Sequence, residues 1–373
     1  MDDYLQLIGP RNFIRVLRDD LEAGKSIVVQ TPRGCHGGIV DAVRRESTND
    51  GGVRWIELDN PVLDDPLKYL CERFRESGGG SGSVASLYRL YGLPAFAGCV
   101  LSLPAMDHGQ LKAWLDFAVQ FAEYSRGVDE LRRSQFVIHV VGSREPVVQN
   151  PELLLTCRIA DGIVDGASAI YFAFGLIQRR SFRRLERKLF AQVCAAIALW
   201  DVGLSARLAQ MTLDRLLNPE AELMRYAKQN GWMPQTDSGG DYEWCIGAQH
   251  TMDGVSVRHS AFLATVGNMD EVKNRIWNAE VAVLFPHLEY CRREMLVRYG
   301  NLIQMPVVDG NGRRIECLED LEISQVLFQI QGRTWLPSDE FQLLKSLRDA
   351  RNALAHGEMV ATEDLNCILN ADR

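Results

Sequence analysis

The sequence contains no C-x-x-C pair, no long apolar run and no excess of basic residues. Its nine cysteines are an odd number, which fits neither a disulfide framework nor a standard zinc module. The most apolar stretches, 167–177 and 189–200, are shorter than the roughly 20 residues of a membrane span, so we expect buried helices there. The opening MDDYLQL carries acids where a secretory signal carries bases. We therefore expect a protein of the reducing cytoplasm without a membrane segment.

Composition and charge narrow the class further. The chain has 373 residues, of which 46% are hydrophobic and 24% charged, as in globular proteins. At roughly 100–200 residues per domain, this length predicts two or three domains. The net charge of −8 opposes general adhesion to nucleic acid or acidic membranes, because such binding needs a basic face. Any contact with nucleic acid must therefore be local.

Residues 1–160 alternate short apolar runs with helical patterns. The runs that we expect to be strands lie at 26–30, 53–58, 98–103 and 135–141. Strands separated by helices indicate a parallel sheet with crossover connections. The first domain is therefore predicted to be an α/β domain.

Residues 161–265 are predicted to form a second, mainly helical domain. The pattern is helical from 178 to 231, and Asp253-Gly254 between two apolar-rich runs indicates a hairpin turn. Helices followed by a hairpin suggest a winged-helix or lid-like domain.

Residues 266–373 are predicted to form an all-α bundle. Its clearest helix covers 268–300, where Asn268 and Glu271 have the spacing of a capping box. A further helix is expected over 338–355.

The segment IVVQTPRGCHGGIVDAV, residues 27–43, has the layout of a strand, a phosphate-binding loop and a helix. In the pattern G-x-x-x-x-G-K-[ST], the lysine would fall on Gly37 and the hydroxyl on Gly38. Backbone N–H groups at Gly34, Gly37 and Gly38 could still bind an anion with help from Arg33. The alternative is that these glycines only make a turn from strand to helix.

This segment, together with AGCVLSLPAMD and FVIHVVGSREP, resembles the P-loop NTPases of the AAA+ and STAND type. In that family the second strand segment ends in adjacent acids that hold magnesium and activate water. Here Asp107 arrives several residues late, whereas Ser143 and Arg144 match the sensor position. The resemblance implies a degenerate P-loop-like domain that could bind ATP or ADP without hydrolysing ATP.

The segment LRDARNALAHGEM resembles the R-x(4–6)-H signature of the HEPN superfamily, many members of which are metal-independent ribonucleases. Cleavage of RNA without metal needs a proton-transfer group and a fixed cation for the phosphorane, which His356 and Arg351 could provide. Asn352 would orient the phosphate. The resemblance also implies a homodimer through the helical domain. The alternative is that these residues form a hydrogen-bonded helix clamp that cleaves nothing.

The run RRSFRRLERK is the one basic patch suited to RNA, DNA or phosphates. If helical, it places its cations on two neighbouring stripes: Arg180, Arg184 and Lys188 on one, and Arg179, Arg183 and Arg187 on the other. The alternative is a solvated helix face paired with acids elsewhere. No metal site is expected, because the spacing of Cys245, His250 and His259 matches no standard one.

Two hypotheses remain. The first is a partner-binding regulatory component of a prokaryotic antiviral defence or toxin-like system, built on an ATPase-derived module with little or no ATP hydrolysis. The second is a HEPN-type ribonuclease that uses Arg351 and His356 and is regulated by the first domain.

Overall fold

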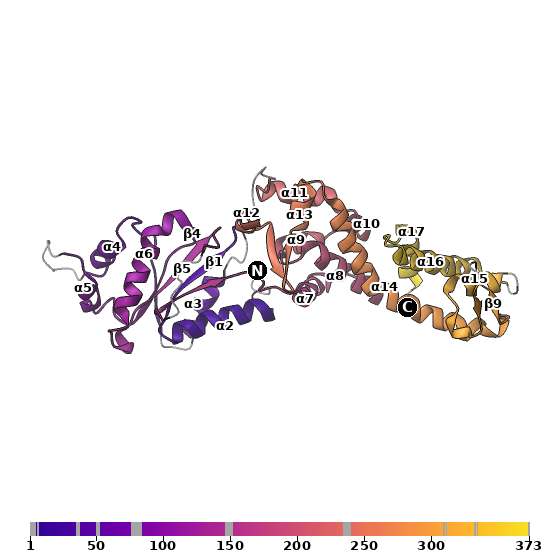
Figure 1. Cartoon of the computed structure of the whole chain (residues 1–373), viewed down its shortest axis with the longest axis horizontal. Helices are drawn as coiled ribbons and strands as arrows, with labels where there is room; N and C mark the ends of the chain where they lie inside the picture. Colours follow the sequence, from indigo (N-terminus) through magenta and orange to yellow (C-terminus); the bar gives the residue numbers. More distant parts are fainter. Residues whose placement is uncertain are drawn as a thin grey trace. The chain divides into compact units, whose positions relative to one another are not determined.

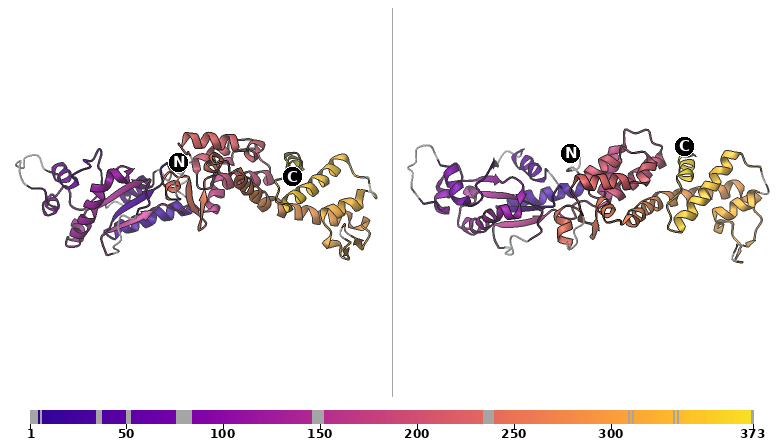
Figure 2. Two further views of the ribbon diagram at one scale, coloured as in Figure 1. Left: turned by 45° about the horizontal axis from the view of Figure 1, so that its top comes forward. Right: turned by 90° about the horizontal axis from the view of Figure 1, so that it is seen from above.

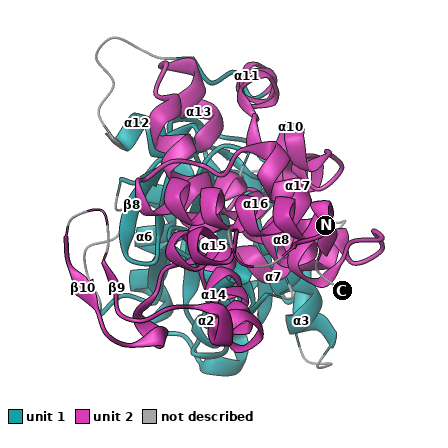
Figure 3. Ribbon diagram, turned by 90° about the vertical axis from the view of Figure 1, so that its right-hand side faces the viewer, with its two compact units in different colours: residues 1–168, 230–259 teal, residues 169–229, 260–373 magenta. Residues whose placement is uncertain are grey.

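The computed structural model describes residues 5, 7–34, 38–49, 53–75, 84–145, 152–233, 240–308, 310, 312–331, 333 and 335–371. The chain divides into two compact units, which Figure 3 shows in different colours. Unit 1 consists of Met1–Ser168 and Asn230–His259, and unit 2 of Ala169–Gln229 and Ser260–Arg373. In the described part of the chain, no helix combines the length and apolar character needed to cross a bilayer.

A parallel sheet lies at the centre of unit 1 (Figure 1). Its order is β2-β3-β5-β1-β6, and a short β4 pairs with the end of β5. The strands are β1 (Ser26–Thr31), β2 (Arg54–Glu57), β3 (Cys99–Ser102), β4 (Met106–Asp107), β5 (Gln135–Val141) and β6 (Leu155–Ile159). The parallel sheet and the four predicted strands are confirmed, whereas β4 and β6 were not predicted.

Helices cover both faces of this sheet, so all six residues of β1 are buried (Figure 1). Helices α2 (Ile8–Glu22) and α3 (Ile39–Asn49) pack together on one face. The other face carries α4 (Pro66–Arg73), α5 (Leu87–Gly92) and α6 (His108–Ser125), which enclose an aromatic core. Within it, the rings of Phe121 and Phe136 meet edge to face with centroids 4.8 Å apart, an arrangement that favours a unique packing.

A β-hairpin completes unit 1. After α12 (Gly240–Cys245), β7 (Gln249–Met252) pairs antiparallel with β8 (Val255–Arg258). The turn residues Asp253 and Gly254 have φ values of 51° and 80°, as a two-residue hairpin turn requires. The predicted Asp-Gly hairpin is therefore confirmed.

Unit 2 is helical apart from a two-stranded ribbon of β9 (Val307–Val308) and β10 (Arg314–Ile315). The predicted long helix is confirmed as α14 (Met269–Tyr299), and α8 and α16 both pack against it (Figure 2). The remaining helices are α7 (Gly166–Ile177), which begins in unit 1, α8 (Arg184–Ala198), α9 (Val202–Leu208), α10 (Leu213–Leu217), α11 (Glu220–Gln229), α13 (Ser260–Thr265), α15 (Ile323–Gln331), α16 (Ser338–Ala355) and α17 (Thr362–Ala371).

Candidate functional site

The loop after β1 carries its arginine in an ion pair. Nη2 of Arg33 lies 2.9 Å from Oδ1 of Asp107, the residue just before α6, and both side chains are about half exposed. The backbone N–H of Arg33 donates to the carbonyl of Cys245 at 2.9 Å. A side chain at Gly142 would come within 2.9 Å of the Arg33 guanidinium, so this glycine gives the arginine room. Arg33 and Asp107, the acid at the end of the segment AGCVLSLPAMD, therefore neutralise each other.

The glycines of this loop are described in part. Gly34 and Gly38 adopt φ values of 71° and 88°, which glycine adopts without strain. Gly38 directly precedes α3, as predicted for a turn from strand to helix. Gly37 lies outside the described residues.

The two residues at the predicted sensor position lie in a different network. Ser143 is buried, and its hydroxyl accepts a hydrogen bond from the N–H of Glu145 at 3.2 Å. Arg144 pairs with Asp161 and lies over the ring of Trp244, 5.1 Å from its centroid. The Arg144 guanidinium is thus bound to side chains of its own unit.

Asp161 is the centre of that network. Its carboxylate also accepts hydrogen bonds from Nδ1 of His250 at 2.7 Å and from the N–H and hydroxyl of Thr251, both at 2.8 Å. Burial by itself raises the pKa of Asp161, but the bonds from His250 and Thr251 outweigh it and hold the pKa below its usual value. Asp161 therefore fastens the hairpin to the end of β6.

A cavity of about 340 Å³ opens at the carboxyl ends of β2 and β3. In open α/β sheets, ligands bind at this edge. His139 of β5 lines the cavity, and its Nε2 lies 2.9 Å from the hydroxyl oxygen of Thr31. Burial lowers the pKa of His139 to about 4, so this side chain is neutral at pH 7. The charged lining residues are Asp41, Arg44, Glu57 and Asp59.

Arg44 is the one lysine or arginine among the described lining residues of this cavity, and it contacts both Asp41 and Glu57, so it is already paired. With three acids and one arginine, the formal charge of the cavity is −2. Our sequence analysis did not identify this cavity. The acids of WIELD, at the carboxyl end of the second predicted strand, were the signal that could have indicated it.

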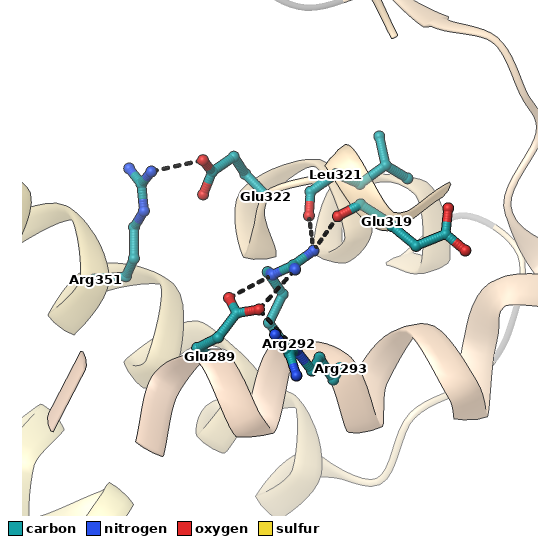
Figure 4. A network of polar contacts seen from close by, with 7 residues as sticks. All are labelled: Glu289, Arg292, Arg293, Glu319, Leu321, Glu322 and Arg351. Atoms are coloured by element: carbon teal, nitrogen blue, oxygen red, sulfur yellow. Dashed lines mark hydrogen bonds and ion pairs between the residues drawn. The ribbon is translucent and has the colours of Figure 1, made fainter. Parts of the chain in front are cut away.

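A second cavity, of about 260 Å³, lies in unit 2 between α14, α16 and the segment that leads into α15. Arg351 of α16 lines it and forms an ion pair with Glu322, with Nη2 2.7 Å from Oε1 (Figure 4). Arg351 is 34% and Glu322 46% exposed, so water reaches both partners. Three further acids line the cavity: Glu289, Glu319 and Asp320.

Arg292 fixes one wall of this cavity (Figure 4). Its guanidinium donates to both carboxylate oxygens of Glu289 at 2.8 Å, and to the backbone carbonyls of Glu319 and Leu321 at 2.7 and 2.9 Å. The hydrogen bond from Arg292 lowers the pKa of Glu289 to about 2, so the pair stays charged at neutral pH. Arg292 is therefore a structural clamp between α14 and the segment before α15.

The structure does not bring His356 into the cavity beside Arg351. His356 follows the last residue of α16, where its N–H donates to the carbonyl of Asn352 at 3.1 Å, and its side chain is exposed. Neither Asn352 nor His356 is among the lining residues of the cavity. Gly357, with φ 80°, closes the end of the helix. The predicted position of His356 at a helix end is confirmed.

A buried acid near the end of α16 was not predicted. Glu280 of α14 is fully buried, and its Oε2 accepts a hydrogen bond from the N–H of Val360 at 3.0 Å. Burial raises the pKa of Glu280 to about 7. A lone glutamate within a helix gives no sequence signal of burial.

The predicted helical stripes of basic residues are wrong for the first part of the run, because α8 begins only at Arg184. Arg180 donates to the carbonyls of Ala209 and Met211 at 2.7 and 2.8 Å. Its guanidinium lies over Phe182 and Phe190, 4.3 and 4.7 Å from the ring centroids. Arg180 therefore has a structural role.

The other basic residues divide in the same way. Arg183 donates to the carbonyls of Leu369 and Asn370 at the end of α17. Arg187 donates to the carbonyl of Phe182 at 3.2 Å. Arg179, Arg184 and Lys188 are exposed, and Arg183 is exposed as well although it bonds to the two carbonyls of α17. Three of the six residues predicted to contact nucleic acid, Arg180, Arg183 and Arg187, therefore bind backbone carbonyls of the chain itself.

Comparison with known proteins adds no family. No protein-family model matches the chain, and no curated protein matches it. Among the described residues, no group of three or more His, Cys, Asp or Glu side chains could hold a metal ion.

Proposed function

We propose that this protein is a partner-binding regulatory component of a prokaryotic defence or toxin-like system, built on an ATPase-derived module with little or no ATP hydrolysis. The observation that carries the proposal is the ion pair between Arg33 and Asp107. It joins the loop that would hold phosphate to Asp107, the acid of the segment that would hold magnesium. The domain keeps the parallel sheet and the loop after β1, while Arg33 and Asp107 bind each other.

The sheet order supports an ATPase-like origin. Numbered along the chain without the short β4, the strands lie in the order 2-3-4-1-5. This order differs from those of Rossmann and flavodoxin-like sheets. The three sequence segments that are similar to AAA+ and STAND proteins contribute β1, β3 and β5, which lie side by side in this sheet.

The charges oppose hydrolysis. Phosphoryl transfer depends on positioned cations that compensate charge at the γ-phosphate. The loop has no lysine after its glycines, and Arg33, Arg44 and Arg144 are each paired with a carboxylate of the chain. A nucleotide could therefore bind only weakly, and its γ-phosphate would remain intact.

The test combines nucleotide and partner measurements. Phosphate release from ATP with magnesium should equal that of a buffer control, and isolation of the tagged chain from its native cells should yield one partner at constant stoichiometry. Magnesium-dependent phosphate release that disappears in Arg33→Ala would contradict the proposal. So would a chain that is isolated alone under all salt conditions.

A ribonuclease is the second candidate, and one observation favours it. Arg351 lines an open cavity and is held by a single exposed ion pair, while His356 is exposed at the end of the same helix. A dimer or a bound RNA could bring such exposed groups to one phosphate.

Cleavage of mixed structured and unstructured RNAs in EDTA tests this candidate. Arg351→Ala and His356→Ala should both abolish cleavage. Arg348→Ala is the matched control, because Arg348 lies one turn earlier on α16 and pairs only locally with Asp349. Equal cleavage by all four proteins would indicate a contaminating nuclease and would reject the candidate.

A further inference from the structure

Glu322 binds the guanidinium that the ribonuclease candidate needs. Oε1 of Glu322 lies 2.7 Å from Nη2 of Arg351, in the cavity between α14, α16 and the start of α15. Carboxylate and phosphate oxygens bind guanidinium in the same geometry, so they compete for the same donors. While Glu322 holds Arg351, an incoming phosphate must displace a carboxylate.

The main chain of Glu322 is fixed independently of this ion pair. Its N–H donates to Oε1 of Gln325 at 2.8 Å, and its carbonyl accepts from the N–H groups of Gln325 and Val326 in the first turn of α15. The segment just before it is held by Arg292, which binds the carbonyls of Glu319 and Leu321. Release of Arg351 therefore requires only a rotation of the Glu322 side chain, and no rearrangement of the cavity wall.

The strength of the contact suits a reversible block. Both partners are partly exposed, and exposed ion pairs are weak and screened by salt. A polyanion with several phosphates could displace such a carboxylate, whereas a buried pair would resist exchange. Arg292 differs in this respect, because its guanidinium makes four hydrogen bonds that an incoming phosphate would have to replace.

We infer that Glu322 is a built-in competitor that holds Arg351 in a blocked state until a phosphate group displaces it. This inference rests on the ribonuclease candidate for its ligand, RNA. It explains why the cationic residue of the HEPN-like segment faces an acid rather than solvent. It also makes the activity of the site sensitive to any partner that draws Glu322 away.

The experiment measures binding and cleavage of one fluorescein-labelled single-stranded oligoribonucleotide in EDTA at low salt. Glu322→Gln keeps the shape of the side chain and should bind RNA about two- to fivefold more tightly than the wild type, the range expected for removal of one exposed ion pair. Glu322→Asp keeps the charge but shortens the reach, and its affinity should lie between the two.

Two further variants make the result specific. The double variant Glu322→Gln/Arg351→Gln should lose the gain, because the released guanidinium is its source. Glu316→Gln removes a more exposed acid of unit 2 that pairs with Arg314, and should leave the affinity for RNA at the wild-type value. Unchanged thermal melting of each variant checks that it folds.

The outcomes separate this inference from the function on which it rests. Equal affinity of Glu322→Gln and wild type, or a gain that persists without Arg351, overturns the competitor role. Absence of RNA binding by every variant overturns it as well. If Glu322→Gln binds RNA more tightly and no protein cleaves it, the competitor role is supported and the ribonuclease is rejected. If the wild type and Glu322→Gln cleave RNA at the same rate, the ribonuclease is supported and the competitor role is rejected.

Discussion

Arg33 and Asp107 form an ion pair, with 2.9 Å between Nη2 and Oδ1, across the carboxyl edge of the parallel sheet. Arg33 follows β1, and Asp107 is the last residue of β4. Under the proposed function, the pair joins the two positions at which an ATPase would hold phosphate and magnesium, and this pairing is the reason that ATP is not hydrolysed.

Asp107→Asn should release Arg33 and raise the affinity for ATP about threefold, in line with the weak energy of an exposed ion pair. Asparagine still caps helices well, so α6 should keep its start. Isothermal titration with ATP in EDTA measures the change. Glu152→Gln is the control, because it removes an exposed acid of the same unit. Equal affinity of both variants would show that Arg33 does not contact the nucleotide.

Arg180 and Arg184 should respond differently to alanine, although they are neighbours in the basic run. Arg180→Ala removes two charged hydrogen bonds and two ring contacts, and should lower the free energy of unfolding by about 2 kcal/mol. Arg184 is exposed, so Arg184→Ala should change the free energy of unfolding by less than about 0.5 kcal/mol.

A double variant of the exposed cations tests the role of the run in RNA binding. Arg184→Ala combined with Lys188→Ala should weaken RNA binding and reduce its salt dependence if the exposed cations contact phosphates. Denaturant unfolding and RNA titrations over a range of salt concentrations measure the two effects. A large loss of stability in Arg184→Ala would contradict the assignment of packing to Arg180 and of exposure to Arg184.

Helices and strands of this fold were predictable where the spacing of apolar residues and the length of the run both indicate the same type of element. The four predicted strands and the helix Met269–Tyr299 gave strong sequence signals. The strand Leu155–Ile159 did not, because Thr156 and Arg158 interrupt its apolar character at the edge of the sheet. Helix α8 began later than predicted because Arg180 bonds to carbonyls far along the chain, a tertiary contact that local propensity cannot reveal.

The sequence indicated which residues of the candidate sites carry a functional charge, but it did not indicate which residues bind them. The sequence identified Arg33, Arg144 and Arg351 as cations of interest, but the acids that bind them lie 74, 17 and 29 positions away. Such pairing depends on which loops meet at a sheet edge or a helix junction. The burial of Glu280 and His139 depends equally on tertiary packing.

His139 should make unit 1 less stable as pH falls. Burial lowers its pKa to about 4 in the folded state, whereas in the unfolded chain it is near 6.5. Below pH 6.5 the unfolded state therefore binds more protons, and stability declines from pH 6.5 to pH 4 by up to about 3 kcal/mol. His139→Gln should remove most of this slope. Hydrogen exchange of β1 and β5 amides at pH 5 and pH 7 measures it, and equal slopes in both proteins would reject the assignment.

Glu280 should give unit 2 the opposite dependence. Its folded pKa of about 7 lies above the unfolded value near 4.5, so the folded state binds more protons between these pH values. Stability is then greatest below pH 4.5, declines by up to about 3 kcal/mol as pH rises to 7, and stays low above it. Glu280→Gln keeps an acceptor for the N–H of Val360 without the charge, and should be the more stable protein at pH 8.

Hydrogen exchange of the Val360 amide at pH 5 and pH 8 follows this effect in the intact chain. Glu294→Gln is the control, since Glu294 is exposed on the same helix and its removal should leave exchange unchanged. If the Val360 amide exchanges equally fast in Glu280→Gln and in the wild type at pH 8, the prediction is wrong, and the Glu280 carboxyl is charged and solvated in the folded state. Because His139 weakens unit 1 in acid and Glu280 weakens unit 2 in base, the stability of unit 1 relative to unit 2 should rise between pH 5 and pH 8.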